Sequence, residues 1–507
     1  MSTATQAEVP TADEQEAKDA AQLASLGYRQ QLTRAVGLWQ NFTVGFTYLS
    51  PIAGVYPLFA YGLATAGPAF FWTMPIVVVG QLVVLLTFSE IASQYPIAGG
   101  IFQWTKRLVG PRYAWLSGWL YTWALLVTVA SIAFSSSGYA SQLFGYTNTH
   151  LATVICAAAV ILICSAVNLA GIRRLAFVSS IGTVAELIAT VGLGIYLLIA
   201  VSHRGIGAIF HSYGAGSGGY TGAFLAAALF SVWIFYGFEA CGDIAEEVKN
   251  PSQKIPRAMR MTLGVGSVAS AIITIAFILA VPSITAVISG KDADPIGTIL
   301  TNAFGSGGSK VVLAVIVFAF ISACMSVQAA ATRLVFSYAR DGMIVGSRPL
   351  SNVHPRFHMP PGAVAVTAVI PIVITLLPTA TVARIITFAV VGIYVGFQSV
   401  VLASLIARRR GWRPAGAFTL GKWGPAVNLV ALVYGVSAIV VLCIKTPAVG
   451  SGFFDRWLVP ISLVIVAGIG LLYLLIARPR ESIREDARVE SSSTESPLVR
   501  AGEVQQG

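Results

Sequence analysis

Apolar residues in this chain form long, continuous runs that short polar loops separate. Twelve runs are each about as long as the 20 residues that an α-helix needs to cross a bilayer. They lack the alternation of apolar and polar positions that is typical of strands in a membrane barrel. The pattern therefore predicts an all-α integral membrane protein with twelve transmembrane helices, at residues 37–61, 68–93, 113–141, 151–169, 176–201, 222–247, 259–284, 310–336, 361–378, 384–406, 425–444 and 457–477.

Composition supports a membrane protein and excludes several other classes. Of the 507 residues, 56% are hydrophobic and 10% are charged, whereas a soluble domain carries about 25% charged residues. The net charge of +11 comes from basic loops, and no basic–aromatic ribbon indicates nucleic-acid binding. The five cysteines lie in or beside apolar runs without a CxxC pattern, so we expect buried thiols and no metal site.

The loops predict how the chain is oriented. Loops after every second run hold basic clusters such as Arg173 with Arg174, and the loops between them are poor in basic residues. Basic loops remain in the cytoplasm, so both termini are predicted to be cytoplasmic. The polar ends, residues 1–34 and 478–507, are predicted to be disordered tails on that side. The first of them lacks the apolar core of a signal peptide.

The first apolar run is interrupted by a proline-rich stretch. Ser50, Pro51 and Gly54 lie near its middle, and Pro57 follows. Each proline removes a backbone donor, and lipid cannot satisfy the carbonyl and N–H groups of a broken helix. Such a break is tolerated where it lines a cavity and its polar groups contact a ligand. The alternative is a simple proline kink.

A second interruption occurs five runs later. Gly237 lies among aromatic residues, and Glu239 and Asp243 follow it at helical spacing. Two broken helices in matching places are typical of a five-plus-five inverted repeat with a binding site between the halves. The predicted division is a first repeat at 35–201, a second repeat at 202–406 and two further helices at 407–477.

Four stretches in order carry a resemblance to a known family. The chain resembles the amino acid–polyamine–organocation superfamily, and within it the amino acid/choline branch that includes GABA permeases. The resemblance covers about residues 35–480 and implies a leucine-transporter-type fold in the cell membrane and transport of a small amine-bearing solute. The matching stretches are SPIAGV at 50–55, SEIASQYPIAGG at 89–100, GFE at 237–239 with AEEVKN at 245–250, and TRLVFSYARDG at 332–342.

The two breaks supply the candidate substrate site. The N–H groups that open the second half of the first helix suit a carboxylate, and the family resemblance implies the same role. Freed carbonyls and Glu239 suit an ammonium group, unless Glu239 is structural, and an aromatic ring at the second break can cover a cation. The predicted substrate-binding residues are Ser50, Ile52, Ala53, Gly54, Val55, Phe235, Tyr236, Gly237, Phe238 and Glu239.

Ion coupling has two candidates. Glu186 lies about mid-depth in the fifth run, where a lone carboxylate is costly and suited to carrying a proton; the alternative is a carboxyl group hydrogen-bonded between helices. In relatives that work without sodium a basic residue occupies the corresponding place, so Glu186 departs from that pattern. Ser322 and Ser326 offer oxygen atoms for a sodium site, the less favoured alternative.

These features predict a secondary active transporter that imports an amino acid or a related small amine, such as GABA, by alternating access with proton coupling. The alternatives are an exchanger, a choline, ethanolamine or polyamine carrier of the same fold, and a sodium-coupled symporter. The thin set of intramembrane polar residues does not favour an enzyme, and we expect no cofactor. No GxxxxGK[ST] loop occurs, so direct use of ATP is not indicated.

Overall fold

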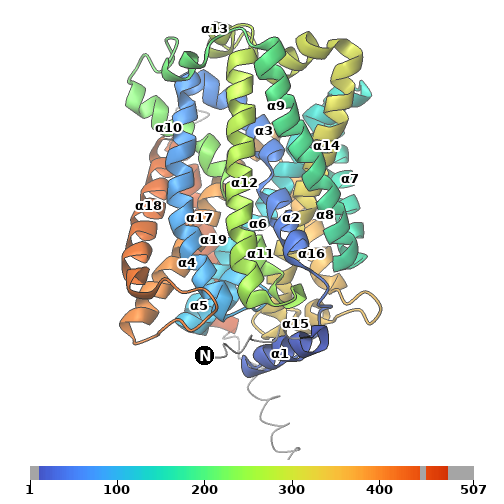
Figure 1. Ribbon diagram of the computed structural model, residues 1–507, viewed down its shortest axis with the longest axis vertical. Coiled ribbons are helices and arrows are strands. Elements are labelled where there is room, and N and C mark those ends of the chain that lie inside the picture. Colours follow the sequence, from blue (N-terminus) through green and yellow to red (C-terminus); the bar gives the residue numbers. More distant parts are fainter. Residues whose placement is uncertain (1–10, 446–452, 478–507) are drawn as a thin grey trace, which may run out of the picture.

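The structure is a bundle of long, roughly parallel helices (Figure 1). It is a computed structural model that describes residues 11–445 and 453–477. Within those ranges no strand occurs, and one isolated bridge joins Val36 to Val248. Helix α1 (Ala12–Ser25) lies at one end of the bundle, hereafter the N-terminal face, and α13 (Ile284–Ile288) lies at the opposite end. The all-α class predicted from the sequence is confirmed.

Ten helical segments of the described chain are long and apolar enough to cross a membrane. Two shorter apolar helices, α10 (Tyr220–Ile234) and α16 (Pro361–Thr375), occupy the sixth and ninth predicted runs. The number of twelve crossings therefore stays a prediction. The long segments are α2 (Leu38–Leu49) with α3 (Pro51–Ala66), α4 (Thr73–Gln94), α6 (Pro111–Phe144), α7 (His150–Leu169), α8 (Ile172–Leu187) with α9 (Leu193–Tyr196), α12 (Pro251–Ala280), α14 (Pro295–Arg340), α17 (Thr379–Arg409), α18 (Gly424–Lys445) and α19 (Phe453–Ala477).

The first predicted break separates α2 from α3. Ser50 adopts φ 40° between them, a backbone conformation that residues other than glycine rarely take. Pro51 then starts α3, where a missing N–H has no consequence, and the Ser50 hydroxyl accepts a hydrogen bond from the Ala53 N–H at 3.1 Å. Pro57 lies inside α3 and does not end it. Proline and cap together explain why the break falls at Ser50.

The second predicted break follows α10. Helix α10 ends at Ile234, and α11 (Ala240–Asp243) begins after five non-helical residues. Gly237 lies between them with φ 108°, and a Cβ there would be 2.2 Å from Tyr48 Cδ1. Only glycine meets both conditions. Because Tyr48 belongs to α2, the two breaks lie against each other inside the bundle, where α10 packs on α3 and α11 on α2.

Part of the N-terminal segment that the sequence predicts as a disordered tail is helical. Thr11 and Glu14 form a reciprocal capping box at the start of α1. Leu23 and Tyr28 are 2% and 5% exposed against the body of the bundle. The prediction of disorder for this part was wrong because average polarity hides these two buried anchors. Residues 1–10 and the tail predicted at 478–507 lie outside the described residues.

Candidate functional site

A small enclosed cavity lies where the two breaks meet. Its volume is about 10 Å³, which is roughly the space that one water molecule needs. The walls are therefore closed around the cavity, and a solute larger than a water molecule would fit only if they separated. The lining residues come from α2, α3, α6, α10 and the second break, and they are Tyr48, Leu49, Ala53, Gly54, Ile132, Trp233 and Tyr236.

Three of the predicted substrate-binding residues line this cavity: Ala53, Gly54 and Tyr236. Of the three aromatic candidates only Tyr236 does so. Phe238 instead packs between Phe88 and Phe397, with ring centroids 5.9 and 5.5 Å away. The remaining apolar candidates are buried in the core and do not line the cavity: Ile52, Val55 and Phe235.

Four lining residues were not predicted. Tyr48 and Leu49 directly precede the first break, and Trp233 lies just before the second, so proximity to a break was a usable signal. Ile132 is an ordinary apolar position of α6, and nothing in the sequence distinguishes it. Trp233 also donates a hydrogen bond through Nε1 to the Ala53 carbonyl at 3.2 Å. This bond joins α10, the helix before the second break, to α3, the helix after the first break.

The predicted anion-binding donors are partly occupied. The Ala53 N–H donates to the Ser50 hydroxyl at 3.1 Å and the Gly54 N–H donates to the Ser50 carbonyl at 2.8 Å. A substrate carboxylate at the start of α3 would therefore compete with Ser50 for these donors. Ser50 itself contributes to the site through this cap and does not line the cavity.

Glu186 lies on α8 and contacts the first break directly. Its Oε1 accepts a hydrogen bond from the Ser50 hydroxyl at 3.0 Å. The side chain is fully buried, and Oε2 has no hydrogen-bond partner in the part of the chain that the structure describes. No ion pair to Glu186 occurs among those residues either. A buried carboxyl group with a single hydrogen bond is an unusual and costly feature of a membrane helix.

Glu239 folds back on the second break. Its Oε1 accepts a hydrogen bond from the Tyr121 hydroxyl at 3.0 Å, and Oε2 accepts one from the Gly237 N–H at 2.8 Å. The carboxyl group thus satisfies a backbone donor that the break exposes, which favours the structural alternative. Asp243 is buried one turn further on, and neither oxygen has a hydrogen-bond partner within the described residues.

A cluster of hydroxyl groups lies between α2, α8 and α14. Ser326 Oγ is 2.7 Å from Thr47 Oγ1 and 3.5 Å from Ser179 Oγ. Ser322 Oγ is buried without a partner in the described parts of the chain. Oxygen atoms of this kind suit a hard cation. The cluster therefore keeps sodium as an alternative coupling ion, although Thr47 and Ser326 also satisfy each other.

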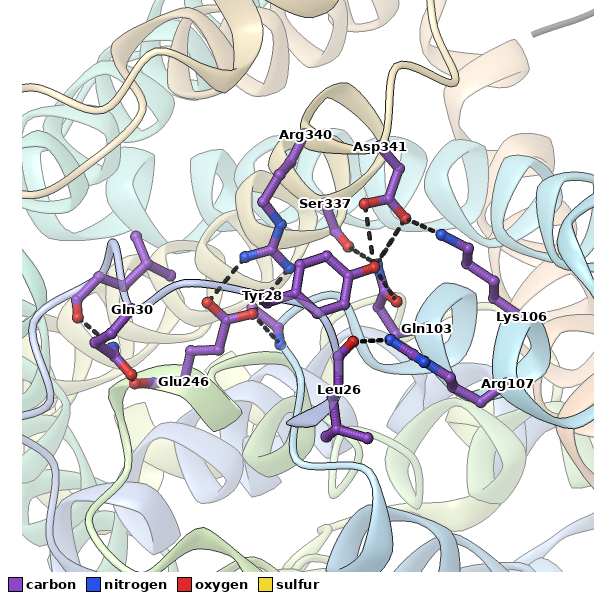
Figure 2. A network of polar contacts seen from close by, with 12 residues as sticks. Leu26, Tyr28, Gln30, Gln103, Lys106, Arg107, Glu246, Ser337, Arg340 and Asp341 are labelled. Carbon is purple, nitrogen blue, oxygen red and sulfur yellow. Dashed lines mark hydrogen bonds and ion pairs between the residues drawn. The ribbon is translucent and has the colours of Figure 1, made fainter. Parts of the chain in front are cut away.

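The N-terminal face is closed by a polar network around Tyr28 (Figure 2). The Tyr28 hydroxyl is 2.9 Å from Gln103 Oε1 and 3.1 Å from both oxygen atoms of Asp341. The Arg340 guanidinium lies 4.2 Å from the Tyr28 ring centroid and forms two hydrogen bonds of 2.8 and 2.9 Å with Glu246. Burial, together with the Asp341 carboxylate, raises the pKa of Tyr28, so its hydroxyl remains a donor.

Two further ion pairs seal the same face. Lys106 Nζ lies 2.8 Å from Asp341 Oδ2, and Arg333 Nε lies 3.1 Å from Glu247 Oε2. Arg333 and Glu247 are both fully buried. These contacts connect α5 (Gly100–Leu108) in the first predicted repeat with α14 and the end of the second break. These ion pairs therefore tie the segments of the N-terminal face to one another.

A bundle with two interrupted helices that meet at an enclosed site defines a multi-pass membrane transporter. Comparison with known sequences agrees: the family model described as amino acid permease matches residues 36–471. The chain belongs to this family, in the amino acid/choline branch of the amino acid–polyamine–organocation superfamily.

Relatives of similar sequence occur in plants and fungi. The chain is 25% identical to the amino-acid permease BAT1 of Arabidopsis thaliana over 450 residues, which cover 82% of this chain and 86% of the relative. It is 26% identical to a choline transporter of Saccharomyces cerevisiae over 431 residues, covering 81% of this chain and 75% of the relative.

Proposed function

We propose that the protein is a proton-coupled secondary transporter that imports an amino acid or a related small amine by alternating access. The observation that carries the proposal is the hydrogen bond between Ser50 and Glu186. It connects a buried carboxyl group to the residue that caps the half-helix beside the cavity. Protonation of Glu186 and binding of a substrate carboxylate therefore act on the same hydroxyl group.

The coupling follows from charge and from hydrogen-bond direction. An ionised Glu186 accepts a hydrogen bond from the Ser50 hydroxyl and repels a substrate carboxylate at the start of α3. A protonated Glu186 removes that repulsion and can donate to Ser50, whose own proton then turns toward the substrate. Each ligand favours binding of the other, and this linkage is reciprocal. Proton and amino acid would therefore enter the site together.

The rest of the site assigns the other end of the substrate. The Tyr236 ring at the cavity wall could cover an ammonium group, and the carbonyl groups of Phe235 and Tyr236 at the broken backbone could accept hydrogen bonds from it. The closed cavity and the sealed N-terminal face support a cycle in which the two faces open in turn. The basic loops support a cytoplasmic position for the N-terminal face of the protein in the cell membrane, and release on that side would be import.

A second candidate function is transport of choline or another cationic amine. The similarity to a fungal choline transporter and the aromatic residues around the cavity favour it. A substrate without a carboxylate would not need the N–H donors of α3. Protonation of Glu186 would then relieve no repulsion, and the coupling through Ser50 would not operate. Two mechanistic alternatives remain. One is exchange of substrates, and the other is coupling to sodium bound at the hydroxyl cluster.

Uptake into proteoliposomes tests these proposals. Labelled amino acids, GABA, choline, ethanolamine and polyamines are offered with an imposed proton gradient, an imposed sodium gradient or neither. The proposal expects accumulation of an amino acid only with the proton gradient. Accumulation driven by the sodium gradient would contradict proton coupling and indicate sodium symport. Uptake that requires a substrate inside the vesicle would indicate exchange.

A further inference from the structure

A pocket away from the central site opens on the N-terminal face. It lies where α7 ends, α8 begins and α16 begins, and its volume is about 460 Å³, within the range of sites for small molecules. Apolar side chains form most of its wall. Leu169 and Phe357 remain 38% and 36% exposed there, so the described chain leaves this apolar surface uncovered.

Three arginines line the apolar pocket or the pocket that adjoins it. Arg174 lines the pocket itself, and Arg173 with Arg356 lines an adjoining pocket of about 310 Å³ that shares Ala170 and Phe357 with it. All three arginines are exposed. Unlike Arg333 and Arg340 of the sealed network, none of them pairs with a carboxylate in the described parts of the chain.

Histidines add further basic groups to the same place. His354 lines the apolar pocket and His358 lines the adjoining one. The guanidinium of Arg356 lies 5.5 Å from the ring centroid of Phe357, which holds it beside the apolar wall. The site therefore joins an uncovered apolar surface to a concentration of basic side chains whose arginines have no carboxylate partner among the described residues.

The position of the pocket indicates the source of its ligand. It lies at the ends of membrane-crossing helices, so it is at the boundary between bilayer and water. Further along these helices Leu162 of α7 and Val369 of α16 are 57% and 58% exposed, as expected of surfaces that face acyl chains. A ligand at this boundary can place an apolar chain on one side and an anionic group on the other.

We propose that this pocket binds an anionic glycerophospholipid of the surrounding leaflet. One acyl chain lies against Leu169 and Phe357, and the phosphate is held by Arg173, Arg174 and Arg356. Arginine is well suited to phosphate oxygens, and basic pockets between membrane helices on the cytoplasmic side bind anionic headgroups. A free phosphate would use only the arginines, whereas a neutral lipid would use only the apolar wall.

The test is a thermal-shift titration of the purified full-length protein with dioctanoylphosphatidylglycerol. Dioctanoylphosphatidylcholine and glycerol 3-phosphate serve as the neutral lipid and the free phosphate. We expect saturable stabilisation by the phosphatidylglycerol that exceeds that of either other compound. Substitution of the three arginines, R173Q/R174Q/R356Q, is expected to weaken the apparent affinity by about fivefold for each charge removed.

A matched control removes the same charge elsewhere on that face. Arg409, Arg410 and Arg413 are also exposed and lie outside both pockets, so R409Q/R410Q/R413Q is expected to retain the wild-type affinity. Ala166 lines the apolar pocket, and Ala166→Phe is expected to reduce the affinity without any change of charge. Equal loss in both arginine variants, equal stabilisation by glycerol 3-phosphate, or no effect of Ala166→Phe would overturn the proposal.

Discussion

Ser50 donates a hydrogen bond to Glu186 across 3.0 Å, although 136 residues separate the two in the chain. Ser50 is the residue with φ 40° at the first helix break, and Glu186 is fully buried on α8. The contact thus joins the strained point of one helix to the isolated carboxyl group of another. Any change in the charge of Glu186 reaches the α3 cap through a single side chain.

Glu186→Gln is expected to abolish accumulation that a proton gradient drives. Glutamine keeps a hydrogen-bond acceptor for Ser50 but cannot carry a proton, so the substrate should only equilibrate and the accumulation ratio should fall to about one. Binding, measured by thermal shift, should persist. Wild-type initial uptake should rise as the external pH falls, and that of the variant should not. Unchanged accumulation would remove Glu186 from the coupling mechanism.

Gly54→Ala is expected to reduce stability and substrate affinity together. An added Cβ would lie 2.9 Å from Ile234 Cγ1, so α3 and α10 would have to move apart beside the cavity, at a cost of about 1–3 kcal/mol. Gly138→Ala is the control, because a Cβ there has no atom within 4 Å. Normal affinity in Gly54→Ala would show that this helix contact does not shape the site.

Glu239→Gln is expected to weaken the binding of cationic and zwitterionic substrates equally. Both carboxyl oxygens already accept hydrogen bonds, from Tyr121 and from Gly237, so the main loss should be about 1–3 kcal/mol of stability from a disturbed buried network. Tyr121→Phe removes one of these donors and should act in the same direction. A loss confined to cationic substrates would instead identify Glu239 as the group that holds the amine.

Tyr28→Phe is expected to favour opening of the N-terminal face. The variant loses the hydroxyl contacts with Gln103 and Asp341 but keeps the ring under Arg340. A loss of about 1–3 kcal/mol would make opening roughly 5- to 150-fold more frequent. Cys241 is fully buried behind this face, and its rate of thiol labelling, followed by peptide mass spectrometry, reports the opening. Tyr220→Phe, at the start of α10, should leave the rate unchanged.

Glu247→Gln is expected to destabilise the fold by about 3–5 kcal/mol, because it leaves the Arg333 guanidinium buried without its counter-charge. A clear decrease in the melting temperature of the purified protein is the measurement. The double variant Glu247→Gln with Arg333→Met removes both charges and should recover most of the stability. A double variant no more stable than the single one would contradict the importance of this pair.

Much of the fold was readable in the sequence because it depends on local properties. Runs of apolar residues determine where the membrane helices form. Pro51 and Gly237 interrupt these helices through their own backbone preferences, whatever the packing of distant segments. The exception is the N-terminal segment, where the capping box of Thr11 and Glu14 and the burial of Tyr28 outweigh a polar composition. A motif search would have found the capping box, but not the contacts of Tyr28 with Gln103 of α5 and Asp341 at the end of α14.

The sequence by itself determined that this protein is a helical membrane permease with two broken helices and a lone carboxyl group at mid-depth. Only the tertiary structure decided which side chains meet: Ser50 with Glu186, Glu239 with its own broken backbone, and Tyr236 rather than Phe238 at the cavity. Hydrophobicity and helix-breaking act within a few residues of the chain. The direction of a buried side chain depends on packing between segments that are far apart in sequence, and no local pattern encodes that direction.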